Sequence, residues 1–421
     1  MTDILDELQW RGLVAQTTDE SALREALAGG PITAYCGFDP TAPSLHFGNL
    51  VQFVVLRLLQ RGGHRVICLV GGSTGLIGDP RPSAERVLKS KEQTAAWVAN
   101  IERQVRPFLE TEGENPAVFV NNLDWTEDIS ALDFLRDVGK HFRVNQLIKK
   151  EAIAARLSSE EGISYTEFSY QLLQGLDFLE LYRQYGCTLQ VGGNDQWGNL
   201  VAGSDLIHKV EGRSVHLLTT PLLTDSSGEK FGKSAGNAIW LDPSMTSPYA
   251  FYQYWLNIED ASVVGLLKVF SDRSRAEVEE LERAVAEEPW RRSAQRALAE
   301  DVTTMVHGAA ATEAVRSASD ALFGKGDLHA LDGPTLRDAA AELPNGPVTL
   351  GMTLVDALVA VRLADSRNAA RRTIGEGGAS VNGQRVSDGD RVLGPEDVLA
   401  GNVIVLRRGR KNLAAGLVAE E

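Results

Sequence analysis

The sequence predicts an α/β protein with a parallel sheet, followed by an α-helical domain and a small α+β domain. Between residues 32 and 196, short apolar runs alternate with amphipathic stretches, which is the βαβ pattern of a parallel sheet flanked by helices. From about residue 248 the chain becomes charged and alanine-rich with helical spacing. After residue 346, two helical stretches precede glycine-punctuated β segments. These three changes of pattern give the predicted architecture.

The individual elements follow from apolar spacing. Strands are predicted at residues 32–35, 66–70, 117–120 and 188–191, and helices at 50–60, 91–110, 129–138 and 167–185. In the charged region, helices are predicted at 275–286 and 290–307, and the turn-rich stretch 343–348 indicates a linker near Gly346. We therefore expect three domains, at residues 1–220, 221–345 and 346–421.

Composition narrows the class of protein. A net charge of −15 argues against overall electrostatic attraction to nucleic acid or anionic membrane, so any RNA contact needs a local basic patch. Three widely spaced cysteines are too few for a disulfide framework or a C-x-x-C metal site. The acidic N-terminus lacks the features of a signal peptide, and no apolar run approaches membrane-spanning length. We expect a cytoplasmic protein with no membrane partner.

A loop that runs from Cys36 to Asn49 follows the first predicted strand and leads into a helix. Such a loop presents backbone N–H groups and the positive end of a helix dipole to a phosphate, while Gly48 permits close approach. Thr41 and His46 are candidate donors to phosphate oxygens. Taken alone, a single histidine in a turn is more often structural.

A second polar loop contains Lys230-Phe231-Gly232-Lys233-Ser234. Its two lysines would neutralise a triphosphate as charge moves toward pyrophosphate. An isolated charged loop is usually just solvated. A P-loop is excluded because a Walker A motif has four residues between its glycines and directly follows a strand.

Three further segments carry polar candidates. Tyr170, Gln174 and Asp177 share one face of a predicted helix, although a polar stripe is more commonly just amphipathic. Gly193 and Asp195 follow the last predicted strand, where a parallel sheet would bind a ribose. A glycine-rich stretch that ends at Asp79 also follows a strand, but no Gly-Lys-Ser/Thr comes after it, which weighs against a phosphate loop.

The pairing of His46-Phe47-Gly48-Asn49 with Lys230–Ser234, in this order, resembles class I aminoacyl-tRNA synthetases, whose motifs are written HIGH and KMSKS. Asn49 departs from the first motif, where His is usual, and Phe231 and Gly232 depart from the second. The resemblance implies a Rossmann-like catalytic domain that uses ATP with Mg²⁺ as substrate. It assigns catalysis to Thr41, His46, Lys230 and Lys233. With no H-x-x-x-H pair, no protein-bound metal is predicted.

Within that class, the tyrosine-binding positions resemble those of bacterial tyrosyl-tRNA synthetases. The likeness implies that Tyr35 and Asp177 bind the phenolic hydroxyl, and that Tyr170, Gln174 and Asp79 hold the α-ammonium group, with Gln190 also lining the site. Buried polar groups that only a hydroxyl satisfies would reject phenylalanine. The residues assigned to ATP are Cys36, Gly37, Asp39, Gly48, Asn49, Gly193, Asp195, Gln196, Lys233 and Ser234.

The C-terminal segment supplies the local basic patch. From Arg362 to Lys411 there are ten Lys or Arg against six Asp or Glu in an otherwise acidic chain. The segment resembles an S4-type RNA-binding module, with Arg367, Arg371 and Arg372 suited to phosphate contacts. On charge alone, an ordinary small domain with solvated arginines is equally good.

The resemblance therefore predicts a tyrosine–tRNA ligase with L-tyrosine, ATP and tRNA(Tyr) as partners. It also implies a helical anticodon-recognition domain at 221–345 and a homodimer formed through an inserted segment around residues 134–148. Two alternatives remain at this point: a tryptophanyl-tRNA synthetase, which would not need the Tyr35 and Asp177 pair, and a non-catalytic RNA-binding protein on the same fold.

Overall fold

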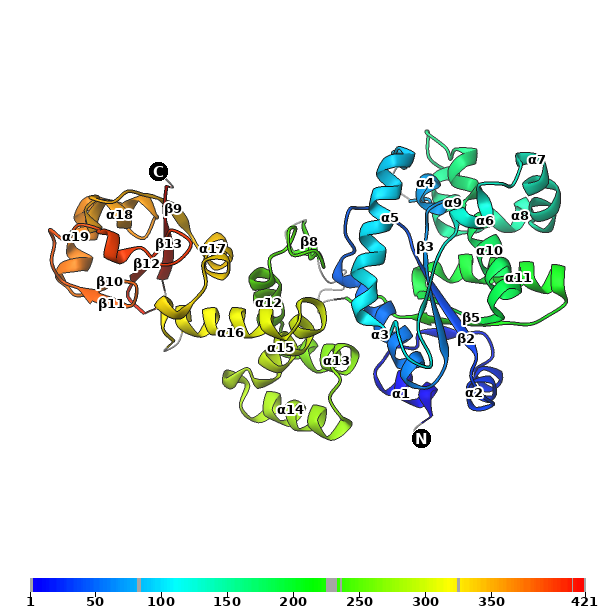
Figure 1. Ribbon diagram of the computed structural model, residues 1–421, viewed down its shortest axis with the longest axis horizontal. Helices are drawn as coiled ribbons and strands as arrows, with labels where there is room; N and C mark the ends of the chain where they lie inside the picture. Colours follow the sequence, from blue (N-terminus) through cyan, green and yellow to red (C-terminus); the bar gives the residue numbers. More distant parts are fainter. Residues whose placement is uncertain are drawn as a thin grey trace. The chain divides into compact units, whose positions relative to one another are not determined.

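A computed structural model describes residues 3–81, 85–224, 233–234, 237–323, 326–410 and 412–419. The chain forms two compact units (Figure 1). The N-terminal unit comprises Met1–Asp242 and Asp260–Arg283, and the C-terminal unit comprises Pro243–Glu259 and Ala284–Glu421. Among the described residues, no helix combines the length and apolar character needed to cross a membrane.

The N-terminal unit is built on a six-stranded sheet of order β1-β6-β5-β2-β3-β4. Five strands are parallel: β2 (Thr33–Phe38), β3 (Arg65–Val70), β4 (Val118–Asn121), β5 (Cys187–Gly193) and β6 (His216–Thr220). The two-residue β1 (Gln16–Thr17) joins β6 antiparallel. The four predicted strands are thus confirmed, while β1 and β6 were missed because β1 has only two residues and β6 has only two apolar residues.

Helices cover both faces of this sheet. Figure 1 shows α3 (Phe47–Arg61) and α5 (Lys91–Val105) on one side, and α10 (Tyr165–Tyr185) and α11 (Trp197–Glu211) on the other. Pro107 follows α5, and the chain there makes a 3₁₀ turn, so the predicted helix at 91–110 ends early. The helix predicted at 129–138 is present from Ala131, where α7 (Ala131–Asp133) continues directly into a π-helical turn at Phe134–Val138.

The C-terminal unit contains a helical group and a small sheet. Its larger helices are α12 (Pro248–Leu256), α15 (Ser293–His307), α16 (Ala309–Phe323) and α17 (Gly333–Glu342). The sheet has the order β11-β10-β12-β13-β9, with α18 (Leu354–Ala360) and α19 (Arg367–Gly375) packed against it. Its strands are β9 (Asn345–Val348), β10 (Ala379–Val381), β11 (Gln384–Val386), β12 (Val403–Arg408) and β13 (Asn412–Val418).

The linker expected near Gly346 is instead a strand. Gly346 lies in β9 and pairs with Gly416 of the parallel strand β13. A Cβ atom at Gly346 would come within 2.5 Å of the Ala360 carbonyl oxygen. Glycine is therefore required by close packing against the end of α18, and the same residue type that indicates a turn in the sequence here permits a backbone contact.

Candidate active site

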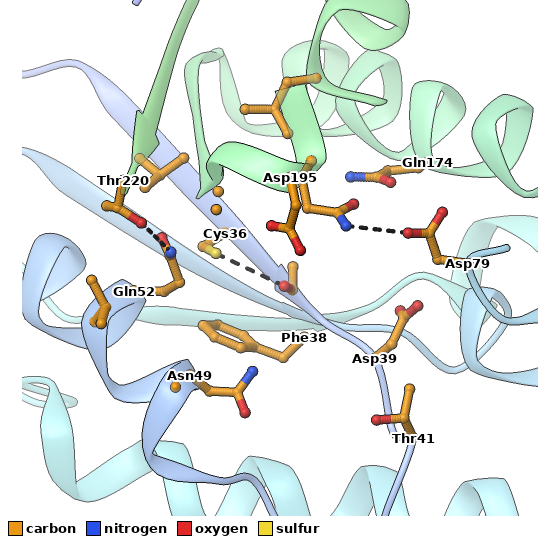
Figure 2. A pocket seen from close by; sticks show the side chains of 18 of the residues that line it. Cys36, Phe38, Asp39, Thr41, Asn49, Gln52, Asp79, Gln174, Asp195 and Thr220 are labelled. Atoms are coloured by element: carbon orange, nitrogen blue, oxygen red, sulfur yellow. Dashed lines mark hydrogen bonds between the residues drawn. The ribbon is translucent and has the colours of Figure 1, made fainter. Parts of the chain in front are cut away.

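One cavity of about 720 Å³ lies at the carboxyl ends of β2 and β5 and beside the start of α3. This is the position at which open parallel sheets bind ligands. Figure 2 shows side chains from opposite sides of this cavity, with Asp195, Gln174 and Asp79 facing Thr41 and Asn49. The cavity is lined by every predicted site residue of the N-terminal unit whose side chain is described: Tyr35, Cys36, Gly37, Asp39, Thr41, His46, Gly48, Asn49, Asp79, Tyr170, Gln174, Asp177, Gln190, Gly193, Asp195 and Gln196.

The predicted lysine loop is only partly described. Lys230 lies outside the described residues. The backbone of Lys233 and Ser234 forms β7, which pairs antiparallel with β8 (Asn237–Ala238). The catalytic roles predicted for both lysines therefore stay predictions.

The cavity wall contains a buried phenol, Tyr35, and a buried carboxylate, Asp177. The ring of Tyr35 packs on Phe178 at 5.2 Å between centroids, and the Tyr35 hydroxyl is buried without a hydrogen-bond partner among the described residues. Asp177 accepts hydrogen bonds from the indole Nε1 of Trp125 and from Nδ2 of Asn122, both at 3.0 Å. Burial raises the pKa of Asp177 to about 7, although these two hydrogen bonds oppose the rise.

Trp125 and Asn122 were missed by the sequence analysis. Neither side chain lines the cavity, so both hold Asp177 from behind. Asn122 directly follows β4, and polar residues at the carboxyl end of a parallel strand are the signal that would have identified it. An ionised carboxylate has about four acceptor positions, so after these two bonds Asp177 retains capacity for further donors.

Asp39 supplies a second carboxylate to the cavity wall. Its Oδ2 accepts from the Tyr170 hydroxyl at 2.7 Å and its Oδ1 from the Thr74 hydroxyl at 2.6 Å. Burial raises the pKa of Asp39, and the two hydrogen bonds offset part of that rise. The predicted partner of Tyr170 was a substrate amine, whereas its hydroxyl here donates to Asp39.

Asp79 is held by a separate network. Its Oδ1 lies 2.8 Å from Nζ of Lys150, and its Oδ2 accepts from Nε2 of Gln196 at 3.1 Å (Figure 2). Lys150 also donates to Oδ1 of Asn199 at 2.9 Å. Lys150 and Asn199 do not line the cavity, so they orient Asp79 from outside it. No motif in the sequence indicated Lys150, because it lies in an irregular segment far from Asp79 along the chain.

Side chains at the start of α3 cap its first turn. Nδ1 of His46, the N-cap residue, accepts from the Gly48 N–H at 3.1 Å, and Oδ1 of Asn49 accepts from the His46 N–H at 3.2 Å. This is a reciprocal capping box. A Cβ atom on Gly48 would come within 2.8 Å of the His46 ring, so glycine is needed for this arrangement. Asn49 therefore has a structural role that the motif alone did not reveal.

The predicted RNA-binding arginines lie together on α19. Arg371 and Arg372 are exposed, and the Arg367 side chain is 67% exposed and pairs with Asp356. Ala370 and Ile374 form the buried side of the same helix. The helix thus presents a basic face to solvent, as the sequence predicted.

Comparisons with known proteins identify the family of the chain. Residues 27–324 match the family model described as tRNA synthetases class I (W and Y), and residues 336–415 match that of the tyrosine–tRNA ligase SYY-like C-terminal domain. The chain is 61% identical to the tyrosine–tRNA ligase of Streptomyces coelicolor over 416 residues, 99% of each chain. It is 60% identical to that of Leifsonia xyli subsp. xyli over 419 residues, 99% of this chain and 95% of the relative.

Solved structures with a similar fold include two C-terminally truncated mitochondrial tyrosyl-tRNA synthetases. The Aspergillus nidulans protein is 28% identical with a TM-score of 0.70, covering 77% of this chain and 95% of that one. The Coccidioides posadasii protein is 31% identical with a TM-score of 0.67, covering 75% and 91%. A tryptophanyl-tRNA synthetase from Encephalitozoon cuniculi, 14% identical with a TM-score of 0.53, shares the fold alone. The chain belongs to the tyrosyl-tRNA synthetase family of the class I aminoacyl-tRNA synthetases.

Proposed function

We propose that the chain activates L-tyrosine with ATP and then transfers it to the 3′ end of tRNA(Tyr) in the cytoplasm. In the first step a carboxylate oxygen of tyrosine bonds to the α-phosphorus of ATP, and the bond from that phosphorus to pyrophosphate breaks. In the second step the terminal ribose hydroxyl of the tRNA attacks the tyrosyl carbonyl, and AMP leaves. Neither step requires a nucleophilic side chain, so the protein contributes positioning and charge stabilisation.

The observation that carries the choice of tyrosine is the buried pair Tyr35 and Asp177 in the cavity wall. The Tyr35 hydroxyl has no partner among the described residues, and Asp177 is fixed by Trp125 and Asn122 with acceptor positions left over. A phenolic hydroxyl placed there satisfies both groups. Phenylalanine would leave them unpaired, and tryptophan has no hydroxyl to offer.

The α-ammonium group of the amino acid is assigned to polar residues of the same cavity. Gln174 Oε1 is buried without a partner among the described residues, and Asp39, Asp79 and Tyr170 line the same cavity. An α-ammonium group donates three hydrogen bonds, which these acceptors suit. Gln190 Oε1 is likewise unpartnered and lines the cavity near Tyr35.

ATP is assigned to the start of α3 and the end of β5. His46 and Asn49 lie at the helix end, where the dipole favours phosphate, and Thr41 lines the same cavity. A Cβ atom on Gly193 would come within 2.7 Å of the Asp195 carboxylate, so glycine allows Asp195 to turn toward a ribose. Lys230 and Lys233 complete the proposed set, and Mg²⁺ enters with ATP and shields its phosphates.

ATP–pyrophosphate exchange with tyrosine, tryptophan and phenylalanine tests this proposal. We expect exchange with tyrosine far above the other two, followed by charging of tRNA(Tyr). Preferential exchange with tryptophan would replace the proposal by the tryptophanyl alternative. A folded protein that binds tRNA and exchanges with none of the three would replace it by the non-catalytic one.

The capping box yields a prediction for Asn49. Asn49→Ala removes the acceptor for the His46 N–H and should lower the free energy of unfolding by about 1 kcal/mol. Asn49→Asp keeps that acceptor, and should keep the stability, but it places a negative charge beside the triphosphate and should raise the KM for ATP about tenfold. Urea unfolding and pyrophosphate exchange measure the two effects. Equal stability of the alanine and aspartate variants would show that the cap contributes nothing.

The C-terminal unit is proposed to bind the tRNA. Arg367, Arg371 and Arg372 on α19 form a basic face suited to the phosphate backbone of RNA, which supports the S4-type assignment. The affinity should fall steeply with salt concentration because bound counterions are released.

We also propose a homodimer formed through the segment around residues 134–148. Leu132 is 79% exposed and Val144 63% exposed, and Leu135 and Ile148 are also exposed on this segment. Several exposed aliphatic side chains on one segment are favourable to bury against a second copy. Leu132→Asp with Val144→Asp should yield a monomer in sedimentation analysis, and Leu350→Asp, an exposed leucine of the C-terminal unit, serves as the control. A wild-type protein that sediments as a monomer contradicts the proposal.

A further inference from the structure

A buried ion pair joins Arg156 and Glu167 outside the cavity. Their side chains are 2% and 1% exposed, and Nη1 of Arg156 lies 3.1 Å from Oε2 of Glu167. Neither residue lines the cavity. Replacing a buried ion pair by apolar residues is often neutral or stabilising, so stability alone does not explain the pair.

The neighbours of this pair indicate what it does. Oε1 of Glu167 accepts from the backbone N–H of Arg86 at 3.0 Å. Nη1 of Arg156 lies 3.4 Å from the Arg81 carbonyl oxygen, and its Nε donates to the Gly162 carbonyl at 3.0 Å. Within the described part of the chain, Oε2 of Glu167 makes no hydrogen bond, so its attraction to Arg156 is electrostatic. The pair therefore contacts the backbone of two arginines that are near each other in sequence.

Both of those arginines reach the cavity. Arg81 and Arg86 line it together with Asp39 and Asp79, whereas the residues that hold their backbone do not. Nε of Arg86 donates to the Asp79 carbonyl at 2.9 Å. Gly78 has a φ of 82°, and a Cβ atom there would lie 3.1 Å from Cγ of Arg86, so the side chain folds closely over this glycine. Arg86 is half-buried, which limits the screening of its charge by water.

We propose that Arg156 and Glu167 are positioning residues for ATP, which hold the backbone at Arg86 so that its guanidinium group is available to the triphosphate. This inference rests on the proposed function. A guanidinium presents several donors in a fixed plane and suits phosphate oxygens, but only if its backbone is held in place. Glu167 fixes Arg86 through one hydrogen bond, and Arg156 holds the Glu167 carboxylate in place through the buried ion pair.

Two double variants test the role of the Glu167 acceptor. Arg156→Met/Glu167→Met and Arg156→Met/Glu167→Gln both remove the two charges together, which avoids leaving one charge buried alone. Only glutamine retains an oxygen for the Arg86 N–H. We expect the methionine–methionine variant to raise the KM for ATP about tenfold, with the KM for tyrosine changed less than about twofold, and the methionine–glutamine variant to stay near wild type.

A third variant connects the effect to Arg86. Arg86→Gln alone should raise the KM for ATP, and adding Arg156→Met/Glu167→Met to it should cause no further rise, because residues that act through one another are not additive. If the methionine–methionine variant does not fold, Glu167→Asp takes its place, since it keeps the charge but withdraws the acceptor from Arg86. It should show the same selective rise in the KM for ATP.

The outcomes separate this inference from the proposed function. Equal KM values for ATP in the two double variants, a parallel rise in the KM for tyrosine, or full additivity with Arg86→Gln would each overturn the positioning role. Calorimetry without tyrosine measures the ATP affinity of the same variants directly. The methionine–methionine variant should bind ATP more weakly than the methionine–glutamine variant. A wild-type protein that binds ATP but does not exchange with tyrosine refutes the proposed function, while the calorimetric ranking still decides the inference.

Discussion

Asp177→Asn is expected to lower kcat/KM for tyrosine about a hundredfold while leaving that for phenylalanine nearly unchanged, so that selectivity between the two collapses. The carboxylate accepts from Trp125 and Asn122 and has acceptor positions left for the substrate hydroxyl. An asparagine has one acceptor oxygen, and its NH₂ group would face one of these donors. Pyrophosphate exchange with each amino acid gives the two values.

The pH dependence of the KM for tyrosine provides a second test of the role of Asp177. Burial raises the pKa of Asp177 to about 7, so the carboxylate gains a proton as the pH falls below that value and loses an acceptor position. The KM for tyrosine of the wild type should rise as pH decreases through about 7, and that dependence should be absent from Asp177→Asn. The control is Glu180→Gln. Glu180 lies on the same helix as Asp177, but it pairs with Arg183 and does not line the cavity. If Asp177→Asn discriminated between tyrosine and phenylalanine as well as the wild type does, Asp177 would not bind the phenolic hydroxyl.

Lys233→Ala is expected to lower kcat for adenylate formation by about 10²-fold or more, with little change in tyrosine binding. The reason is that charge develops on the leaving pyrophosphate only in the transition state, so a lysine that meets it there affects kcat rather than ground-state affinity. The residue follows the polar segment that contains Lys230 and forms the short strand β7. Single-turnover formation of tyrosyl-adenylate measures the effect directly.

A matched control for this variant is Lys209→Ala. Nζ of Lys209 donates to the His141 carbonyl at 2.9 Å, and the residue does not line the cavity. Lys209→Ala therefore removes one positive charge from the N-terminal unit, as Lys233→Ala does, without changing a residue of the proposed site. Equal rates for Lys233→Ala, Lys209→Ala and wild type would exclude Lys233 from transition-state stabilisation.

The sheet was predictable where apolar runs were long and separated by helical spacing. β2, β3 and β5 of the sheet and the long helices α3 and α10 follow directly from that pattern. The two-residue β1 carries too few residues to show any period. Gly346 illustrates a different obstacle, because a glycine that admits a close backbone contact has the same sequence signature as one that makes a turn.

The site was predictable to the extent that its residues belong to short motifs. His46, Gly48, Asp195 and Tyr170 each lie in a segment whose order along the chain carries the resemblance, and the fold brings them to one cavity. The residues that hold them in place come from elsewhere. Trp125 supports Asp177, and Lys150 supports Asp79, through contacts between segments far apart in sequence, so no local spacing rule reveals them.

The hydrogen bond between Trp125 and Asp177 also gives the protein an intrinsic optical reporter. Indole emission responds to the electric field near its N–H group, and here that group donates at 3.0 Å to a carboxylate that changes charge near pH 7. Of the seven tryptophans in the chain, Trp125 is thus coupled to the ionisation of the pocket that is proposed to receive the phenol. Its fluorescence should register both the protonation of Asp177 and the arrival of a ligand, without any label.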